Sequence, residues 1–233
     1  MSRPSCSRVR LFRRLASDRR GLALLEFAFI LPLFLLLTLT GIELLNYITT
    51  RMRISQVALQ LADNAARIGS GSQLQAKTIS ETDINDLLVG AELQAGELDL
   101  YKRGRVIISS LEPMTSPNPT GLYKIAWQRC RGDKPYDSPH DNTLVGISGG
   151  IGPVGQRVTA PDYGVTMFVD VYYEYRPLIS LSRIFPNANG QIKEFASMMV
   201  RDRRDTSDDS LLGPLATHPK GVYKVAGVTP SAC

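Results

Sequence analysis

Glu26 is the residue whose type and position point most directly to chemistry in this chain. It lies near the start of a run of 21 residues, Leu22 to Ile42, that is otherwise apolar apart from Pro32 and a few Thr and Gly positions. An ionised carboxylate at the centre of a membrane helix costs roughly 2.5 kcal/mol or more, so such a residue usually has a function. An amine at a new N terminus on Leu22 would lie one helical turn from Glu26. The spacing therefore suits a charge pair between Glu26 and an amine.

The apolar run is long enough to cross a bilayer. At about 1.5 Å of rise per residue it would form about 31 Å of helix, close to the ~30 Å hydrocarbon core. Seven arginines and one aspartate precede the run, whereas only Arg51 and Arg53 follow it closely. Because positive charge stays on the cytoplasmic side, this asymmetry predicts a cytoplasmic N terminus and an extracytoplasmic remainder.

The basic character of the chain is confined to its N terminus. Of 27 basic and 22 acidic residues, seven and one lie within residues 1–21, which leaves 20 basic and 21 acidic residues in the rest. The net charge of +5 therefore reflects membrane orientation, and no nucleic-acid partner is expected.

The residues around Glu26 resemble the processing site of type IV prepilins. Two arginines precede Gly21, and four apolar residues, Glu26 and Phe27 follow it. The resemblance is closest to the TadE-like minor pilins, or pseudopilins, of tight-adherence (Flp-type) pilus systems, and it covers about residues 19–68. It implies that a prepilin peptidase cuts between Gly21 and Leu22. It also implies that Glu26 then pairs with an N-terminal amine, its own or a neighbour's, during assembly.

Three other interpretations of the N terminus stay open. An uncleaved single-pass signal anchor would have the same layout. A secretory signal peptide normally has an apolar region of only about 7 to 15 residues and a small-residue cleavage site, which residues 38–41 match poorly. The arginine pairs at 13–14 and 19–20 lack convincing flanks for a twin-arginine signal.

The three cysteines fit the predicted topology. Cys6 lies in the cytoplasmic segment, whereas Cys130 and Cys233 form an even pair in an oxidising compartment. We therefore expect a disulfide between Cys130 and Cys233, with two free thiols as the alternative. His140 and His218 are the only histidines and lie far apart in the sequence, so neither a metal site nor a cofactor is expected.

The pattern of apolar and polar residues predicts four segments. Residues 1–21 are a basic cytoplasmic leader, and residues 22–42 are a transmembrane helix. Residues 43–68 contain no Pro or Gly and carry apolar residues at helical spacing, so they continue the helix with an amphipathic face. The Gly-Ser-Gly-Ser that follows ends the helix. Residues 69–233 form an extracytoplasmic domain.

The sequence of residues 69–233 predicts an α+β domain. A second helix is expected over residues 81–95, with Ser80 or Thr82 as its N-cap. Apolar runs and alternation predict strands at 105–111, 122–131, 165–176 and 191–202. The expected fold is a long N-terminal transmembrane and amphipathic helix packed on a small antiparallel sheet, which matches the pilin-like fold that the resemblance implies.

Two glycine-rich motifs match enzyme signatures only formally. Residues 146–150 match the G-x-S-x-G nucleophile elbow, which needs a strand before Ser148 and a helix after it. Pro153 opposes such a helix, and the downstream His218 lies in a proline-rich tail. Residues 150–155 match G-x-G-x-x-G, but Pro153 lacks a backbone donor for phosphate. No catalytic residue is therefore expected.

The sequence also allows structural expectations for three further sets of residues. Residues 132–164 are rich in Gly, Pro, Asp and Ser, and a loop of this length is usually functional or mobile. Residues 201–210 carry mixed charge and are expected to form a solvated connection. Trp127 and the tyrosines at 172, 173 and 175 are expected in the core, where aromatic strand residues usually pack.

These features predict a TadE-like minor pilin or pilus-assembly protein without enzymatic activity. The expected location is the bacterial inner membrane, with one span and a periplasmic C-terminal domain. The implied partners are a prepilin peptidase, other pilin subunits, the inner-membrane assembly proteins of the tight-adherence system and the lipid bilayer. The alternative is an uncleaved, membrane-anchored periplasmic binding or structural protein.

Overall fold

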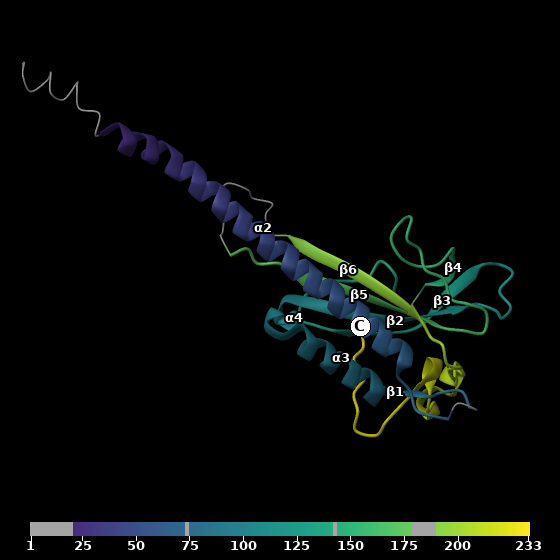
Figure 1. Ribbon diagram of the computed structural model, residues 1–233. Coiled ribbons are helices and arrows are strands. Elements are labelled where there is room, and N and C mark those ends of the chain that lie inside the picture. The colour runs from purple at the N-terminus through teal and green to yellow at the C-terminus, as the bar shows by residue number, and fades with distance from the viewer. Residues whose placement is uncertain (1–20, 73–74, 142–143, 179–189) are drawn as a thin grey trace, which may run out of the picture. The chain divides into compact units, whose positions relative to one another are not determined.

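The computed structural model describes residues 21–72, 75–141, 144–178 and 190–233. The chain divides into two compact units, Met1–Asn46 and Tyr47–Cys233, which are described separately. Its elements (Figure 1) are, in chain order, α2 (Leu22–Arg67), β1 (Ile79–Ser80), α3 (Glu81–Ala95), η2 (Gly96–Leu98), α4 (Leu100–Arg103), β2 (Gly104–Pro113), β3 (Leu122–Arg131), β4 (Val145–Ser148), β5 (Thr166–Glu174), β6 (Gln191–Met199), η3 (Ser210–Leu215), η4 (Pro219–Gly221) and β7 (Val222–Tyr223).

The second unit is built on a five-stranded antiparallel sheet with the strand order β4-β3-β2-β5-β6. The four strands expected from the sequence are present as β2, β3, β5 and β6. Together with the long apolar helix α2, the sheet confirms the α+β class expected from the sequence.

Residues 47–67 of α2, together with α3, cover one face of the sheet, which we call the helix face (Figure 1). The apolar stripe of α2 is buried there, because residues three and four apart lie on one side of a helix. It comprises Ile54, Val57, Ala58, Leu61, Ala62 and Ala65. From β5, every second residue joins this core, because side chains alternate along a strand. These residues are Met167, Val169, Val171 and Tyr173.

The aromatic residues singled out in the sequence are buried as expected. Trp127, Tyr173 and Tyr175 lie in the helix-face core. Tyr172 is also buried, but the alternation along β5 places it on the opposite face of the sheet.

Helix α3 begins with a capping box at Ser80, one of the two expected N-caps. The backbone N–H of Asp83 donates to Ser80 Oγ (3.3 Å), and the backbone N–H of Ser80 donates to Asp83 Oδ2 (2.9 Å). This reciprocal arrangement satisfies two backbone donors that the helix itself leaves unpaired.

The expectation that residues 201–210 are only a solvated connection is wrong for Arg204. Its Nη2 donates to the backbone oxygens of Ala65 (3.1 Å), Ala66 (3.3 Å) and Ile68 (3.0 Å) at the end of α2. Burial lowers the pKa of Arg204 to about 10, which leaves the guanidinium charged at neutral pH. A cation here satisfies carbonyls that the helix leaves unpaired and complements the helix dipole.

Short pairings were missed from the sequence. Within the irregular stretch 132–164, β4 pairs with β3, and Ile151 bridges to Val158. Near the C terminus, β7 pairs in parallel with β1 through Ile79↔Val222. Strands of two to four residues are too short to show a periodic pattern.

The C-terminal tail runs back beside α3 (Figure 1) to the end of β3. Asn85 Nδ2 in α3 donates to the backbone oxygen of Thr229 (3.0 Å), and the N–H of Cys130 donates to the backbone oxygen of Ser231 (2.8 Å). A disulfide joins Cys130 to Cys233, with Cα atoms 4.9 Å apart. The structure thus brings together the two cysteines that the sequence singled out.

Candidate functional site

The first unit presents an apolar helical surface. Apart from the half-buried Leu31, the large apolar side chains between residues 22 and 45 are 44% to 79% exposed. Among the described residues, α2 is the one helix that is long and apolar enough to cross a membrane, judged by length and composition, and its most apolar stretch has a mean hydropathy of 2.5. Leucine and phenylalanine side chains exposed in this density would be costly in water.

The hydroxyl groups of Thr38 and Thr40 in the apolar part of α2 are satisfied within the helix. Thr38 Oγ1 donates to the backbone oxygens of Phe34 (2.9 Å) and Leu35 (3.0 Å), and Thr40 Oγ1 donates to that of Leu36 (2.7 Å). Pro32 lacks a backbone N–H, so the carbonyl four residues before it loses its usual donor. Hydroxyl groups that face hydrocarbon need a hydrogen-bond acceptor within the protein, because no water is available there.

Gly21, Leu22 and Glu26 lie at the start of α2. A Cβ built on Gly21 would meet no atom within 4 Å, so nothing in the packing of the described residues requires a glycine there. Leu22 and Glu26 are both exposed, and no hydrogen bond or ion pair from the described residues reaches Glu26. The structure therefore places the three residues together, with their surfaces available to another molecule.

The second unit carries a groove on the face of the sheet that α2 and α3 leave uncovered, which we call the loop face. Residues 132–141, here called the strap, cross this face. The groove measures about 600 Å³. It is lined by Tyr136, Asp137, Pro139, His140, Gly152, Pro153, Val154, Phe168, Asp170, Val171, Lys193, Glu194 and Phe195.

Polar contacts hold the strap against the sheet. Ser138 Oγ donates to Asp170 Oδ2 (2.5 Å), and Gln128 Nε2 donates to the backbone oxygen of His140 (2.7 Å). Burial raises the pKa of Asp170 above its usual range, while the Ser138 hydrogen bond and nearby His140 oppose the shift. Because these groups are buried together, each contact is stronger than it would be in water.

Aromatic stacking also holds the strap where it crosses the loop face of the sheet. The Tyr136 ring stacks on Tyr172 with centroids 4.7 Å apart, and Lys193 Nζ lies 5.1 Å from the Tyr136 centroid. A cation at this distance from an aromatic ring is attracted to it. Burial also raises the pKa of Tyr136 to about 12, so its phenol stays protonated at neutral pH.

Ser138, His140 and Asp170 do not form a catalytic triad. The Ser138 hydroxyl donates to the carboxylate of Asp170, and His140 Nε2 accepts from the backbone N–H of Gly152 (3.0 Å). A nucleophilic serine needs the imidazole nitrogen as its proton acceptor. The arrangement therefore positions the strap.

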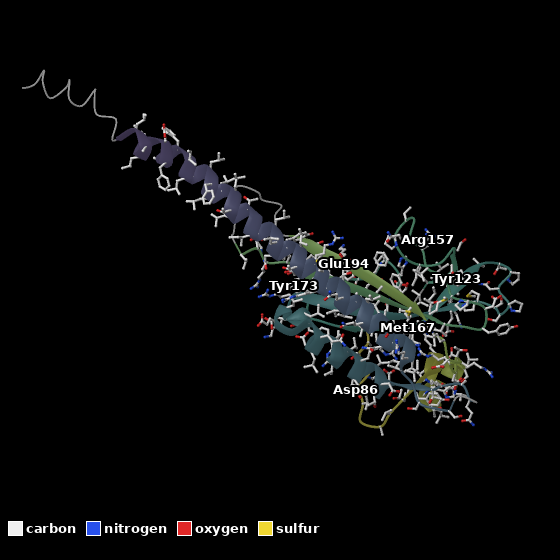
Figure 2. The ribbon with its side chains drawn as sticks, in the orientation of Figure 1. Asp86, Tyr123, Arg157, Met167, Tyr173 and Glu194 are labelled. Atoms are coloured by element: carbon white, nitrogen blue, oxygen red, sulfur yellow. A yellow bond between two sulfur atoms is a disulfide. The ribbon has the colours of Figure 1, made fainter. Side chains whose placement is uncertain are left out.

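The G-x-S-x-G motif overlaps the end of β4, and the second glycine motif lies in the turn that follows it. Ser148 is exposed at the end of that strand, and Arg157 Nη1 donates to its backbone oxygen (3.0 Å; Arg157 is labelled in Figure 2). Gly150 has a φ of +83°, and a Cβ there would lie 2.1 Å from the backbone oxygen of Val158. The glycine at 150 is thus explained by a tight turn.

His218, the other residue of the formal hydrolase motif, lies in the tail. Its Nδ1 is 3.2 Å from Asp209 Oδ2.

An ion pair lies near the edge of the helix face. Glu194 of β6 (labelled in Figure 2) accepts from Arg51 Nε of α2 at 2.6 Å. Arg51 is exposed, so the pair contributes little to stability, as is usual for solvent-accessible ion pairs.

Sequence reasoning missed the groove and the residues that hold the strap. Asp170 carried the available signal: it is the one acidic position in an otherwise apolar or aromatic stretch from Met167 to Tyr173. Its partner Ser138 lies 32 residues earlier, and nothing in the local sequence links the two.

The N-terminal apolar helix and the residues that follow it resemble a family of pilus-associated membrane proteins. The family model described as TadE-like protein matches residues 21–69. That range starts at Gly21 and contains the whole of α2, which confirms the resemblance to TadE-like proteins over this segment. The TadE-like family is structural and non-enzymatic. Comparisons with curated proteins and with solved structures found no match.

Proposed function

We propose that this chain is a TadE-like minor pilin or pilus-assembly protein of a bacterial tight-adherence pilus. Residues 22–42 anchor it in the inner membrane, and residues 69–233 lie in the periplasm. A prepilin peptidase cleaves it after Gly21. The observation that carries the proposal is the TadE-like match over residues 21–69, which coincides with a membrane-length apolar helix.

The glycine at position 21 supports processing there. No neighbouring atom requires a glycine, and its φ lies outside the left-handed region that favours one. Packing therefore does not account for the residue, whereas a peptidase that must approach the backbone closely does. Cleavage would remove the leader, with its net charge of +6, and free an amine at Leu22.

Glu26 then acts in assembly. The freed amine and the carboxylate of Glu26 are opposite charges in a low-dielectric environment, where each is costly without a partner. Pairing within one helix or between neighbouring helices offsets that cost and sets the axial register of the packed helices. The chain carries more than 160 residues after its apolar run, which suits a minor or assembly subunit.

The processing step is tested by mass spectrometry of the mature N terminus, in the native host or with a co-expressed prepilin peptidase. The wild-type chain should start at Leu22, and Gly21→Val should keep residues 1–21 because the added side chain blocks the scissile bond. Gly41→Val is the matched control, since a Cβ at Gly41 also meets no atom within 4 Å. Full-length wild-type protein would instead support the uncleaved anchor and contradict the processing site.

The role of Glu26 is tested with Glu26→Gln, which keeps the shape of the side chain and removes its charge. Membrane insertion should survive, because a neutral side chain enters the bilayer more easily. Assembly should fail, so the processed subunit accumulates in the inner membrane while surface attachment drops; the leftover ammonium costs several kcal/mol, on the order of 3–5. Membrane fractionation and an attachment assay measure both effects. Normal piliation by a fully processed mutant would refute this role.

A further inference from the structure

The strap has a second pocket on its other side, next to the disulfide. This pocket measures about 410 Å³. It is lined by Arg105, Ile107, Gln128, Arg129, Cys130, Tyr136, Asp137, Ser138, Asp141, Ala232 and Cys233. Polar atoms contribute more of its surface than apolar atoms do, in contrast to the groove described above. A pocket of this kind suits a polar ligand.

Arg105 is the unusual residue of this pocket. It lies at the start of β2 and pairs in register with Tyr172 of β5. Its Nε is buried and has no hydrogen-bond partner among the described residues, and no ion pair from those residues reaches its guanidinium. Buried polar groups in native proteins nearly always have a partner, so such an exception calls for an explanation.

Other half-buried arginines of the unit have partners. Arg129 donates to both carboxylate oxygens of Glu81. Arg204 Nε also has no hydrogen-bond partner among the described residues, but its Nη2 donates to three backbone oxygens. Arg105 differs because its guanidinium meets a pocket instead of a protein acceptor. The guanidinium of Arg105 can therefore offer donors to an acceptor from outside the chain that enters this pocket.

The walls of the pocket are fixed in place. Gly132 lies so close to β2 that a Cβ on it would be 2.7 Å from the Cα of Arg105. On another side, the disulfide and the hydrogen bond from Cys130 to Ser231 hold the tail. The pocket is thus preorganised, which lowers the entropic cost of binding a ligand.

The charges around the pocket narrow the class of ligand. A guanidinium binds carboxylate or phosphate through a planar fork of donors. Tyr136 can add its hydroxyl, which has no hydrogen-bond partner among the described residues. Asp137 and Asp141 line the same pocket and are exposed, so they would repel a dianion more than a single carboxylate.

We propose that this pocket binds a carboxylate-bearing ligand, with Arg105 as the residue that contacts the carboxylate. The inference does not depend on prepilin processing or on the role of Glu26. The carboxylate can come from an acidic sugar or from a protein, and the experiment below separates the two sources.

The test uses the full chain in lipid nanodiscs with its disulfide intact and its arginines labelled with nitrogen-15. Absence of one Nε–Hε signal in Arg105→Lys assigns that signal to Arg105. Sodium acetate, sodium glucuronate and a glutamate-rich peptide are titrated separately at constant ionic strength. We expect a saturable shift of the Arg105 signal with all three, and tighter binding of glucuronate or of the peptide identifies the source.

Two variants and one salt control decide the outcome. Isothermal titration calorimetry measures the affinity of the variants, because Arg105→Gln lacks the Nε–Hε signal. Arg105→Gln should weaken binding roughly tenfold to a hundredfold, the effect of losing a charge-assisted hydrogen bond. Arg53→Gln, which removes an exposed arginine from α2, should leave the affinity unchanged. The proposal is overturned if no carboxylate shifts the Arg105 signal, if sodium chloride produces the same shift, or if both variants weaken binding equally.

Discussion

The two faces of the central sheet are held by different interactions. On the helix face, residues of β5 such as Met167 and Val169 are buried by the apolar residues of α2 and α3. On the loop face, Asp170 and Tyr172 of the same strand meet the strap through a hydrogen bond and a stacked ring pair. One strand serves both faces because its side chains alternate.

The difference between the two faces implies that the helix face contributes mainly to stability and the loop face mainly to binding. Apolar burial is non-directional, so the core of the helix face can fill its volume closely. Polar contacts fix the strap at a few points and leave a pocket on each side of it. We therefore expect substitutions on the helix face to change the free energy of unfolding most, and substitutions on the loop face to change local structure and binding.

The largest effect on stability is expected from the helix face. Ile54→Ala should lower the free energy of unfolding by about 2–5 kcal/mol, because Ile54 is fully buried and its loss leaves a cavity. Leu59→Ala on the exposed side of the same helix is the control, with an expected change within about 0.5 kcal/mol. Denaturation of the full chain, followed by fluorescence of the single Trp127, measures both. Equal losses would contradict the division between the faces.

Removal of the disulfide should have the next largest effect. The bond joins residues 103 apart, and replacing Cys130 and Cys233 by serine should cost about 2–4 kcal/mol, because the unfolded chain gains conformational freedom. Non-reducing peptide mapping of the protein from its native host first establishes the bond in the native molecule. Finding both thiols alkylated in that protein would refute the pairing. If the serine variant lost more free energy of unfolding than Ile54→Ala does, the loop face would be the main source of stability.

The smallest effect, and the most informative about pH, is expected from Asp170→Asn. Burial raises the folded-state pKa of Asp170, so the folded protein holds its proton to higher pH than the unfolded chain does. Its contribution to stability is therefore fully present below the ordinary aspartate range and falls as pH rises through the raised pKa. The asparagine side chain would keep an acceptor for Ser138 without this dependence, with an overall change on the order of 1 kcal/mol.

The measurement is the difference in unfolding free energy between wild type and Asp170→Asn across pH. Wild type should gain relative to the variant as pH falls toward the ordinary aspartate range. Taking the difference cancels carboxylates with lowered pKa values, such as Asp202 and Asp205, which act in the opposite direction. Asp137→Asn, the same replacement at an exposed position of the strap, is the control for the change of residue type. A difference that stays constant across pH would refute the assignment to Asp170.

The sequence alone determined the features that have a local period or a local partner. The limits of α2 and the four longer strands followed from spacing over a few residues, and the N-cap of α3 was narrowed to Ser80 or Thr82. The roles proposed for Gly21, Leu22 and Glu26 also rest on local features, namely a spacing of one helical turn and the apolar run behind them. Parity and topology alone were enough to select Cys130 and Cys233.

Only the tertiary structure decided which distant residues meet. Arg204 caps a helix that ends 137 positions earlier, Ser138 bonds to Asp170 across the strap, and Arg105 reaches a pocket that the tail helps to close. None of these pairings leaves a periodic mark in the chain, because each is set by how the sheet, the strap and the tail fold over one another. Local spacing fixes secondary structure and the faces of its elements, while long-range burial decides which polar groups are satisfied and which remain available to a ligand.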